Sequence, residues 1–448
     1  MIEPPGVRER LQHQYGLKVL RLYMDSSEGR DHVMFSFSLQ DGEEAALLTA
    51  SAEEIGLPHG PDAASCERRE LQEAAFRIPE YINSALAHLC RESELPGATL
   101  WIRLATPLGL LTAVPWERLL QPALGVPVLR LPYHVIAPRT PERELDLVIC
   151  FSAPIAKPEL QRNLIDSFIE QIPLDLAKSA NLHLFADLAV YRELLEVKRQ
   201  YGGEYRINVY NPQEASTLGK HAGENPWLAW MRTALGGRSA DVVHFLCHCY
   251  SVRDEGALAL AESPGRNENL EGATLVSAEK VAEFLNATGA WSLAFTSPPS
   301  NVSAVGMRML QDCVARRRPG PVLMHDMAHP DSCRALGAAY RFLYTAEQPA
   351  PASPAISLHC HPFREAGVAP DDQSDRLLDQ FTLAGKLGDR LKNSSQPVWL
   401  AASQRILEAT AGDLAAAVEA DPDSGRKRAR DFVLDALTEY ANPEDVEG

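Results

Sequence analysis

The sequence predicts an α/β protein built on a mostly parallel sheet with helices on both faces. Apolar, strand-like runs alternate with amphipathic, helix-like segments from residue 145 to residue 360. This alternation is typical of β–α–β units, whose crossover helices cover both faces of a parallel sheet. The chain has 448 residues, of which 45% are hydrophobic, so it can form two or three domains with a well-buried core.

Residues 1–95 are expected to form a small N-terminal α+β region. Val33–Leu39 alternates between apolar and polar side chains, which predicts a strand. Gly56–Ser65 is rich in Gly and Pro, which indicates a connecting loop. Arg68–Arg91 has apolar residues at helical spacing, so we expect a helix that is interrupted at Pro79.

Residues 96–362 hold the alternating elements and are expected to form the main domain. The predicted strands are Leu100–Leu104, Leu145–Phe151, Leu182–Phe185, Tyr205–Tyr210, Val242–Cys247, Gly256–Ala261, Trp291–Thr296, Pro321–Met324 and Ala355–Cys360, with a further apolar run at Leu108–Val114. The predicted helices are Glu159–Ile172, Val190–Arg199, Pro226–Leu235, Ser277–Asn286, Val302–Arg317 and Ser332–Tyr344. Ser277 is a suitable N-cap, although Lys280 at the third helical position excludes a capping box.

Residues 363–448 are expected to form a C-terminal helical extension. Gln404–Val418 has apolar residues at helical spacing. The basic cluster Arg426–Arg428, together with Arg430, lies among acidic residues. We therefore expect that cluster to be a solvated helix face.

Charge and composition limit the classes of partner. A formal net charge of −17 argues against nucleic acid or an anionic membrane as the main partner. The N-terminus lacks the apolar core of a secretory signal, and no run of about 18 apolar residues could span a membrane. The eight cysteines show no disulfide-type spacing. A cytoplasmic protein is expected, with no membrane contact and no cofactor.

The most informative residues are His248 and Ser297, each of which follows an apolar, strand-like run. In an open α/β sheet, working residues gather outside the carboxyl ends of the strands. A histidine can act as general base near neutral pH, and a serine hydroxyl is a possible nucleophile. The two residues are therefore predicted to form a catalytic pair at the ends of adjacent strands.

Less specific interpretations of the same residues remain open. His248 could be a structural histidine, and Ser297, which precedes two prolines, could be a turn residue. A serine hydrolase of the Gly-x-Ser-x-Gly type is not indicated, because that motif does not surround Ser297.

Three further histidine-containing groups were considered as sites. His244, Cys247, His248 and Cys249 alternate between the two faces of a strand, so at most two of them could share one metal ion. The group His325, Asp326, His329 and Asp331 could line a cleft or form a polar loop, and His359–His361 has no partner that the sequence identifies. No metal site is predicted.

Several motifs together resemble the CHAT domain, the caspase-related module of the caspase–separase group of cysteine peptidases. They are His244–His248, Gly256–Leu260, the helix at Ser277–Asn286, the strand that leads into Ser297, the Pro-Trp-Glu motif at Pro115–Leu120, and Tyr340–Tyr344. Each motif is short, but their order and spacing agree with the family over residues 99–362, and Trp399–Leu414 resembles a family extension. The resemblance implies a caspase-like three-layer sandwich.

The resemblance also implies a Cys–His dyad with two backbone oxyanion donors. By position the histidine is His248, and the nucleophile position holds Ser297, or Pro298 if the register is shifted by one residue. The oxyanion donors would be the backbone N–H groups of Ser297 and Cys249. The family's glycine after the histidine is replaced by Cys249, and prolines follow the nucleophile position.

These departures predict little or no peptidase activity, because a serine hydroxyl needs a well-oriented base. Natural divergence to a pseudopeptidase is favoured over an engineered Cys-to-Ser change at Ser297. The expected role is a bacterial conflict or defence component with a protein substrate or a regulatory protein partner. An active caspase-like cysteine endopeptidase silenced at Ser297, a non-catalytic adaptor and a serine hydrolase are the alternatives. The sequence leaves the oligomeric state open.

Overall fold

The computed structural model describes most of the chain up to residue 362. The described residues are 11–12, 15–25, 31–39, 44–58, 75–92, 99–106, 108–134, 145–152, 158–172, 180–203, 205–217, 225–252, 255–265, 272–299, 303–345 and 348–362. Apart from His134, they belong to one compact unit. The predicted C-terminal helical extension, with its basic cluster and Trp399–Leu414, lies outside the described residues.

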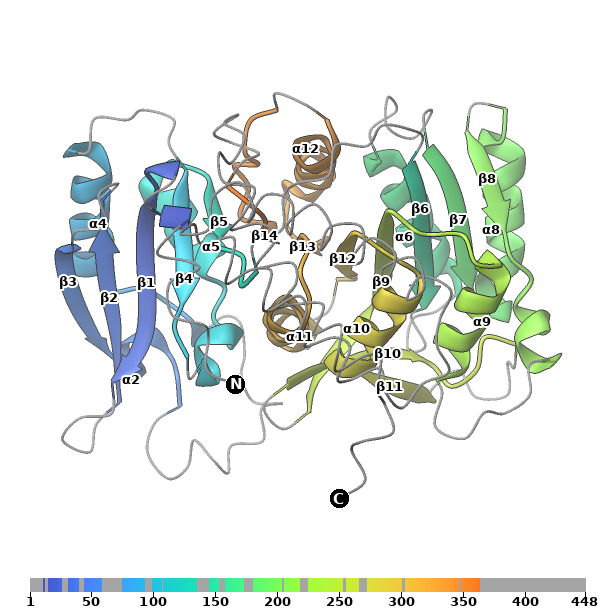
Figure 1. The fold of residues 1–448 in the computed structure, drawn as a ribbon, viewed down its shortest axis with the longest axis horizontal. Helices are drawn as coiled ribbons and strands as arrows, with labels where there is room; N and C mark the ends of the chain where they lie inside the picture. The colour runs from blue at the N-terminus through green and yellow to red at the C-terminus, as the bar shows by residue number, and fades with distance from the viewer. Residues whose placement is uncertain are drawn as a thin grey trace, which may run out of the picture. The chain divides into compact units, whose positions relative to one another are not determined.

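Fourteen strands within the described residues form one mixed sheet (Figure 1). Twelve of them follow the order β3-β2-β1-β4-β5-β14-β13-β12-β9-β6-β7-β8, and β10 and β11 branch from β9. Their bounds are β1 Lys18–Asp25, β2 His32–Ser38, β3 Glu44–Ser51, β4 Leu100–Leu104, β5 Val128–Arg130, β6 Leu145–Ser152, β7 Ala180–Ala186, β8 Arg206–Val209, β9 Val242–Val252, β10 Glu255–Ala261, β11 Ala273–Ser277, β12 Ser292–Ser297, β13 Val322–Asp326 and β14 Ile356–His359.

The sheet has two parallel halves that run in opposite directions. Strands β6, β7, β8, β9, β12 and β13 pair in parallel, and so do β1, β4, β5 and β14. The direction reverses where β14 pairs antiparallel with β13. On its other side, β14 meets β5 through the register pair His359 and Arg130. Strand β14 is therefore the seam between the two halves.

Helices cover both faces of the sheet, as the sequence predicts. One face carries α6 Pro158–Gln171, α8 Leu188–Tyr201 and α12 Ser332–Tyr344, and is called the α12 face. The other carries α2 Ala52–Ile55, α4 Glu80–Glu92, α5 Trp116–Leu124, α9 Pro226–Leu235, α10 Ala278–Ala287 and α11 Ser303–Arg317, and is called the α11 face. Two 3-10 helices, η4 Gly109–Ala113 and η5 Pro212–Thr217, complete the elements. The α/β class with a mostly parallel sheet is confirmed.

Local signals account for the helix ends that the sequence predicts best. Asn225 caps α9 by accepting hydrogen bonds from the amides of Trp227 and Leu228. Pro226 occupies the first turn, and Gly236 ends the helix in the left-handed region with φ of 60°. Ser277 caps α10 by accepting from the Lys280 amide, as predicted.

The break expected at Pro79 in the helix over Arg68–Arg91 is present: residues 76–79 are not helical, and α4 starts at Glu80, since proline restricts the residue before it; residues 68–74 lie outside the described set. The apolar run Leu108–Val114, for which the sequence predicts no element type, contains η4. Strand β9 extends five residues beyond the predicted end, from Cys247 to Val252, because β10 folds back and pairs with that extension.

The sheet is continuous across the predicted domain boundary at residue 95, because β1 pairs in parallel with β4, with Lys18 opposite Leu100. None of the helices in the described part of the chain is long and apolar enough to cross a membrane.

Candidate functional site

The strands that carry His248 and Ser297 are neighbours. Strands β9 and β12 pair in parallel, with Leu246 opposite Thr296. The predicted adjacency of the two strands is thus confirmed, and their carboxyl ends point to the same edge. Ser297 is the last residue of β12, whereas His248 lies inside β9, opposite Ala259 of β10.

The two side chains project from opposite faces of the sheet. Side chains alternate along a strand, and Cys247 and Cys249 lie in the core of the α11 face, so His248 projects to the α12 face. By the same alternation, Ser297 follows Phe295 onto the α11 face. Consistent with this, no hydrogen bond joins His248 and Ser297 among the contacts of the described residues.

Both side chains are shielded from solvent. Ser297 is 1% exposed, and its hydroxyl donates to the carbonyl oxygen of Pro298 at 3.2 Å. His248 is 8% exposed, and burial lowers its pKa below the ordinary histidine value. His248 is therefore neutral at pH 7, which suits a base, but the hydroxyl that it would activate is turned to a neighbouring carbonyl group.

The second expected oxyanion donor, Cys249, lies inside the β9–β10 ladder opposite Leu258. Its thiol donates to the carbonyl oxygen of Ala257 at 2.9 Å, and burial raises the thiol pKa well above its ordinary value. Helix α11 packs closely on the same ladder: a Cβ on Gly256 would lie 1.9 Å from the carbonyl oxygen of Gly306. A side chain at either glycine would push α11 away from this edge.

A directed chain of hydrogen bonds crosses β9, β12 and β13 on the α12 face. Burial lowers the pKa of His325 to about 4 and that of His244 well below its ordinary value, so both rings are neutral at pH 7. His325 Nε2 lies 3.1 Å from the Ser332 carbonyl oxygen, which can only accept, so Nε2 carries the proton. His325 Nδ1 then accepts from the Thr296 hydroxyl at 3.1 Å, and Thr296 accepts from His244 Nε2 at 2.6 Å. The Tyr340 hydroxyl completes the chain by donating to His244 Nδ1 at 2.6 Å.

This chain assigns the residue before Ser297 a structural role. Thr296 and His325 are fully buried, and together they tie β12 to its neighbours β9 and β13 and to α12. His325 neither lines a cleft nor belongs to a polar loop, because it is buried within β13. His329 and Asp331 belong to a surface turn in which the Asp331 amide donates to His329 Nδ1 at 3.2 Å, so the polar-loop interpretation holds for these two. Asp326 ends β13 just before that turn and lines the pocket described below.

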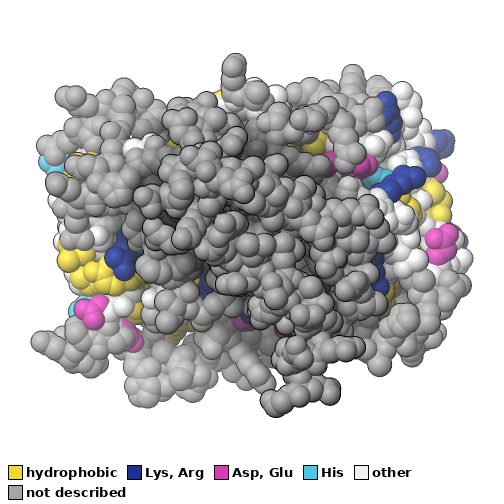
Figure 2. Space-filling view, in the orientation of Figure 1, with side chains coloured by type: hydrophobic (Ala, Val, Ile, Leu, Met, Phe, Trp, Pro, Cys, Tyr) yellow, Lys and Arg dark blue, Asp and Glu magenta, His cyan; other side chains and the backbone are white. Residues whose placement is uncertain are grey.

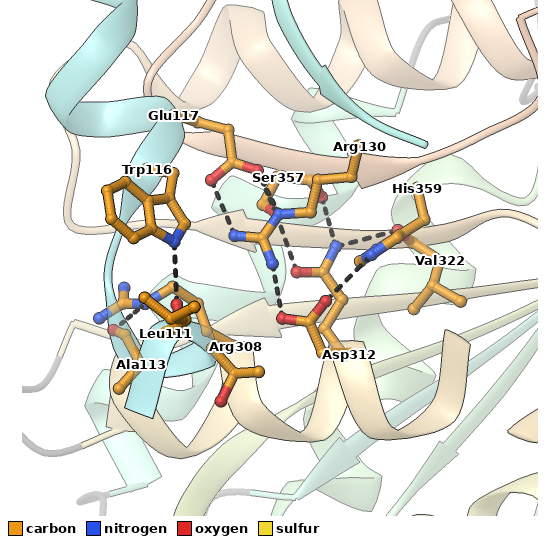
Figure 3. Close-up of polar contacts among 12 residues, drawn as sticks. Leu111, Ala113, Trp116, Glu117, Arg130, Arg308, Asp312, Val322, Ser357 and His359 are labelled. Atoms are coloured by element: carbon orange, nitrogen blue, oxygen red, sulfur yellow. Dashed lines mark hydrogen bonds and ion pairs between the residues drawn. The ribbon is translucent and has the colours of Figure 1, made fainter. Parts of the chain in front are cut away.

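A buried ionic cluster, called here the Arg130 cluster, occupies the seam between the sheet halves (Figure 3). Arg130 at the end of β5 donates Nε and Nη2 to the Glu117 carboxylate at 2.6 and 3.0 Å, and Nη1 to Asp312 at 2.6 Å. The exposed fractions of Arg130, Glu117 and Asp312 are 2% or less. Charge-assisted hydrogen bonds of this kind are stronger than neutral ones. They also join distant parts of the chain, because Asp312 is 182 positions from Arg130.

Three further side chains complete the Arg130 cluster. His359 Nε2 lies 3.0 Å from Asp312 Oδ1. The Ser357 hydroxyl lies 2.7 Å from the Glu117 carboxylate and 2.9 Å from the side-chain oxygen of Gln311. Burial, the largest single effect, would raise the pKa of Asp312 and of Glu117, but the charge of Arg130 and the hydrogen bonds to each carboxylate together lower both. The partner of His359, which the sequence did not identify, is thus Asp312 of α11.

A small pocket, partly open to solvent, lies beside the Arg130 cluster. Its lining comprises Pro115, Glu117, Arg118, Arg308, Met324, Asp326, Pro354, Ala355, Ile356 and Ser357. Asp326 is the register partner of Ser297. The pocket therefore borders the strand end that carries Ser297, on the same face of the sheet.

Within the described residues, no group of three or more His, Cys, Asp or Glu side chains has an arrangement that could hold a metal ion. Comparison with known proteins leaves the family open: no family model matches the chain, and no curated protein matches it in sequence.

Proposed function

We propose that this chain is a caspase-like protein of the CHAT type whose peptidase-type site is inactive, a cytoplasmic pseudopeptidase that acts through a regulatory protein partner in a bacterial conflict or defence system. The observation that supports the inactive site is the direction of the two side chains: the hydroxyl of Ser297 and the imidazole of His248 project from opposite faces of the sheet. The family itself rests on the motif resemblance described above.

The geometry argues against nucleophilic catalysis in two steps. A serine attacks only when a base within hydrogen-bond reach takes its proton, and another group usually orients that base. Ser297 instead donates to Pro298, and the described contacts include no carboxylate that orients His248. The pocket that borders Ser297 is then available for contact with a partner rather than for cleavage.

The direct test is a cleavage assay of the chain with casein and with a pooled peptide library. We expect no cleavage above that of Ser297→Ala, which serves as the matched control because it removes only the hydroxyl. Cleavage that Ser297→Ala abolishes would overturn the proposal and favour a serine hydrolase.

A second test addresses the alternative of a silenced cysteine endopeptidase. In Ser297→Cys, a thiol poised beside a base would react with an iodoacetamide probe faster than an ordinary thiol. We expect the new thiol to react no faster than buried Cys313, whose pKa burial raises to about 11, and far more slowly than exposed Cys333. Mass spectrometry of the labelled peptides gives the ranking. Preferential labelling at position 297 that His248→Ala weakens would restore the active-enzyme interpretation.

A further inference from the structure

A second set of catalytic-type side chains lies on β6, β7 and β8, on the α11 face. Asp146 is on β6, His183 is on β7, and Tyr210 follows the end of β8. The ring of Tyr210 stacks on Phe185 with centroids 4.4 Å apart and an interplanar angle of 3°. The position of the phenol is therefore set by the sheet and not by a loop alone.

The three polar side chains form one hydrogen-bonded line. His183 Nε2 lies 3.2 Å from Asp146 Oδ1, and His183 Nδ1 lies 2.8 Å from the Tyr210 hydroxyl. The carboxylate can only accept, so Nε2 carries the proton and Nδ1 of the neutral ring accepts from the phenol. Asp146 is itself held by the Asn181 side chain at 3.1 Å, and its backbone amide donates to Asp241 at 2.9 Å.

The protonation states suit proton transfer from the phenol. Burial lowers the pKa of His183, and the opposing hydrogen bond to Asp146 does not reverse that shift, so the ring is neutral at pH 7. Burial raises the pKa of Tyr210, so the phenol is protonated. The order carboxylate, imidazole, hydroxyl is that of a hydrolytic triad, with a phenol in the place of the serine.

The line is open to solvent at its Tyr210 end and flanked by cations. His183 is 1% exposed, whereas Tyr210 is partly exposed. Arg206 shares the sheet face as the register partner of Asn181, and the charge of Arg238 contributes to the pKa of both His183 and Tyr210. Figure 2 shows Lys and Arg side chains, with Asp or Glu side chains among them, at the end of the molecule where Figure 1 places β8 and α8. Such charges would attract an anionic reactant.

We propose that Tyr210 is a base-activated acceptor for a phosphoryl group, delivered by an anionic donor such as an acyl phosphate or a phosphoanhydride. The phenol oxygen of Tyr210 attacks phosphorus while its proton moves to His183 Nδ1. The donor's leaving group departs with the electron pair of the broken P–O bond. The imidazolium that forms is paired with Asp146, and the product is an O-phosphotyrosine. This site is separate from His248 and Ser297 and does not depend on the function proposed for them.

The test uses two sulfonyl fluorides of opposite charge, 4-(fluorosulfonyl)benzoate and 4-(2-aminoethyl)benzenesulfonyl fluoride, on the full chain. Both react with activated phenols with loss of fluoride, and peptide mass spectrometry counts the label at each tyrosine. We expect Tyr210 to label at least about tenfold faster than Tyr201, since a positioned general base typically contributes a factor of about 10² or more. The anionic reagent should be the faster of the two.

Two variants separate activation from simple exposure. His183→Gln removes the base. Asp146→Asn keeps the shape of the side chain that binds His183 but removes its negative charge. Each variant should lower the labelling rate of Tyr210 about tenfold or more and leave that of Tyr201 unchanged. In the parent chain, the labelling rate of Tyr210 should be constant from pH 8 to pH 7. It should fall only at lower pH, where His183 becomes protonated, because burial holds the pKa of His183 below the ordinary histidine value. Incubation with acetyl phosphate should then give phosphotyrosine at position 210.

Four results would overturn the proposal. Labelling of Tyr210 only at the rate of Tyr201 would show that the phenol is not activated. Labelling that both variants leave unchanged would reduce the line to a structural contact, and the use of two variants guards against one that fails to fold. Faster labelling by the cationic reagent, or no phosphotyrosine from acetyl phosphate, would exclude the phosphoryl assignment.

Discussion

The Arg130 cluster and the His248–Ser297 pair lie on strands of the same sheet but differ in how their polar groups are satisfied. In the cluster, the charge of Arg130 meets two carboxylates at 2.6 Å, and side chains from β14 and α11 complete the contacts. In the pair, Ser297 makes one bond to the adjacent residue, and His248 projects from the opposite face. The pair His248 and Ser297 thus has fewer contacts than the Arg130 cluster, in which Glu117 of the Pro-Trp-Glu motif binds Arg130 and Ser357.

The difference shows that two sets of polar residues on one sheet can differ widely in how strongly their contacts constrain them. Burying charges is costly unless each is paired and hydrogen-bonded, so the Arg130 cluster tolerates few changes. A serine that binds a neighbouring carbonyl group carries no such constraint. Four predictions follow from this contrast, in order of expected effect on stability.

The largest effect is expected for Arg130→Met, which leaves Glu117 and Asp312 buried without their cation. Breaking a buried ion pair on one side costs about 3–5 kcal/mol of unfolding free energy. Urea denaturation would measure the loss. Arg317→Met is the control, because Arg317 pairs with the partly exposed Glu255 and should cost about 1 kcal/mol or less. Equal losses for the two variants would contradict the central role of the cluster.

The free energy of unfolding should fall as the pH falls from about 6.5 to about 4. Unfolded His325 takes up a proton near pH 6.5, whereas burial holds the folded pKa at about 4, so the unfolded state binds more protons throughout this window. At about 1.4 kcal/mol per pKa unit, His325 lowers the free energy of unfolding by an amount that approaches about 3 kcal/mol near pH 4. Denaturation at a series of pH values should give a shallower slope for His325→Gln. Parallel slopes would disprove the assignment.

A smaller loss is expected for Thr296→Val, which keeps the side-chain volume but removes the hydroxyl between His244 and His325. Leaving a buried donor and a buried acceptor unsatisfied costs about 2–3 kcal/mol in total. The matched control is Thr49→Val, since the Thr49 hydroxyl is exposed and bonds only to Met34; it should change stability by less than about 0.5 kcal/mol. Indistinguishable denaturation midpoints would mean that the chain through Thr296 contributes nothing measurable.

The smallest effect is expected for Ser297→Ala, at less than about 1 kcal/mol, because the lost bond joins adjacent residues. Ser357→Ala, the same change within the Arg130 cluster, should cost more, since it removes a buried hydroxyl that contacts both Glu117 and Gln311. Thermal denaturation of the two variants side by side sharpens the comparison. A larger loss for Ser297→Ala would show that this hydroxyl has a structural role that its contacts do not explain.

Much of the fold was predictable because its signals are local. Asn225, Pro226 and Gly236 define α9 by capping chemistry alone, and the bounds of α9 and α12 match the prediction. Apolar runs such as Leu145–Phe151 identify several of the parallel strands within one or two residues. The strands β1, β3, β5 and β11 were missed. Strand β3 lies at the edge of the sheet, and β5 and β11 are only three and five residues long. The prediction that His248 and Ser297 form a catalytic pair stays a prediction.

The sequence by itself determined the α/β class, the alternation of elements and the residue at the end of β12, because periodicity and capping act over a few residues. Only the tertiary structure decided which polar groups meet. Arg130 and Asp312 are 182 positions apart and come together because β14 reverses the direction of the sheet between them. Likewise, a shift of one residue along a strand moves a side chain to the other face of the sheet. Whether two side chains on neighbouring strands meet therefore depends on the register between the strands, which no local pattern contains.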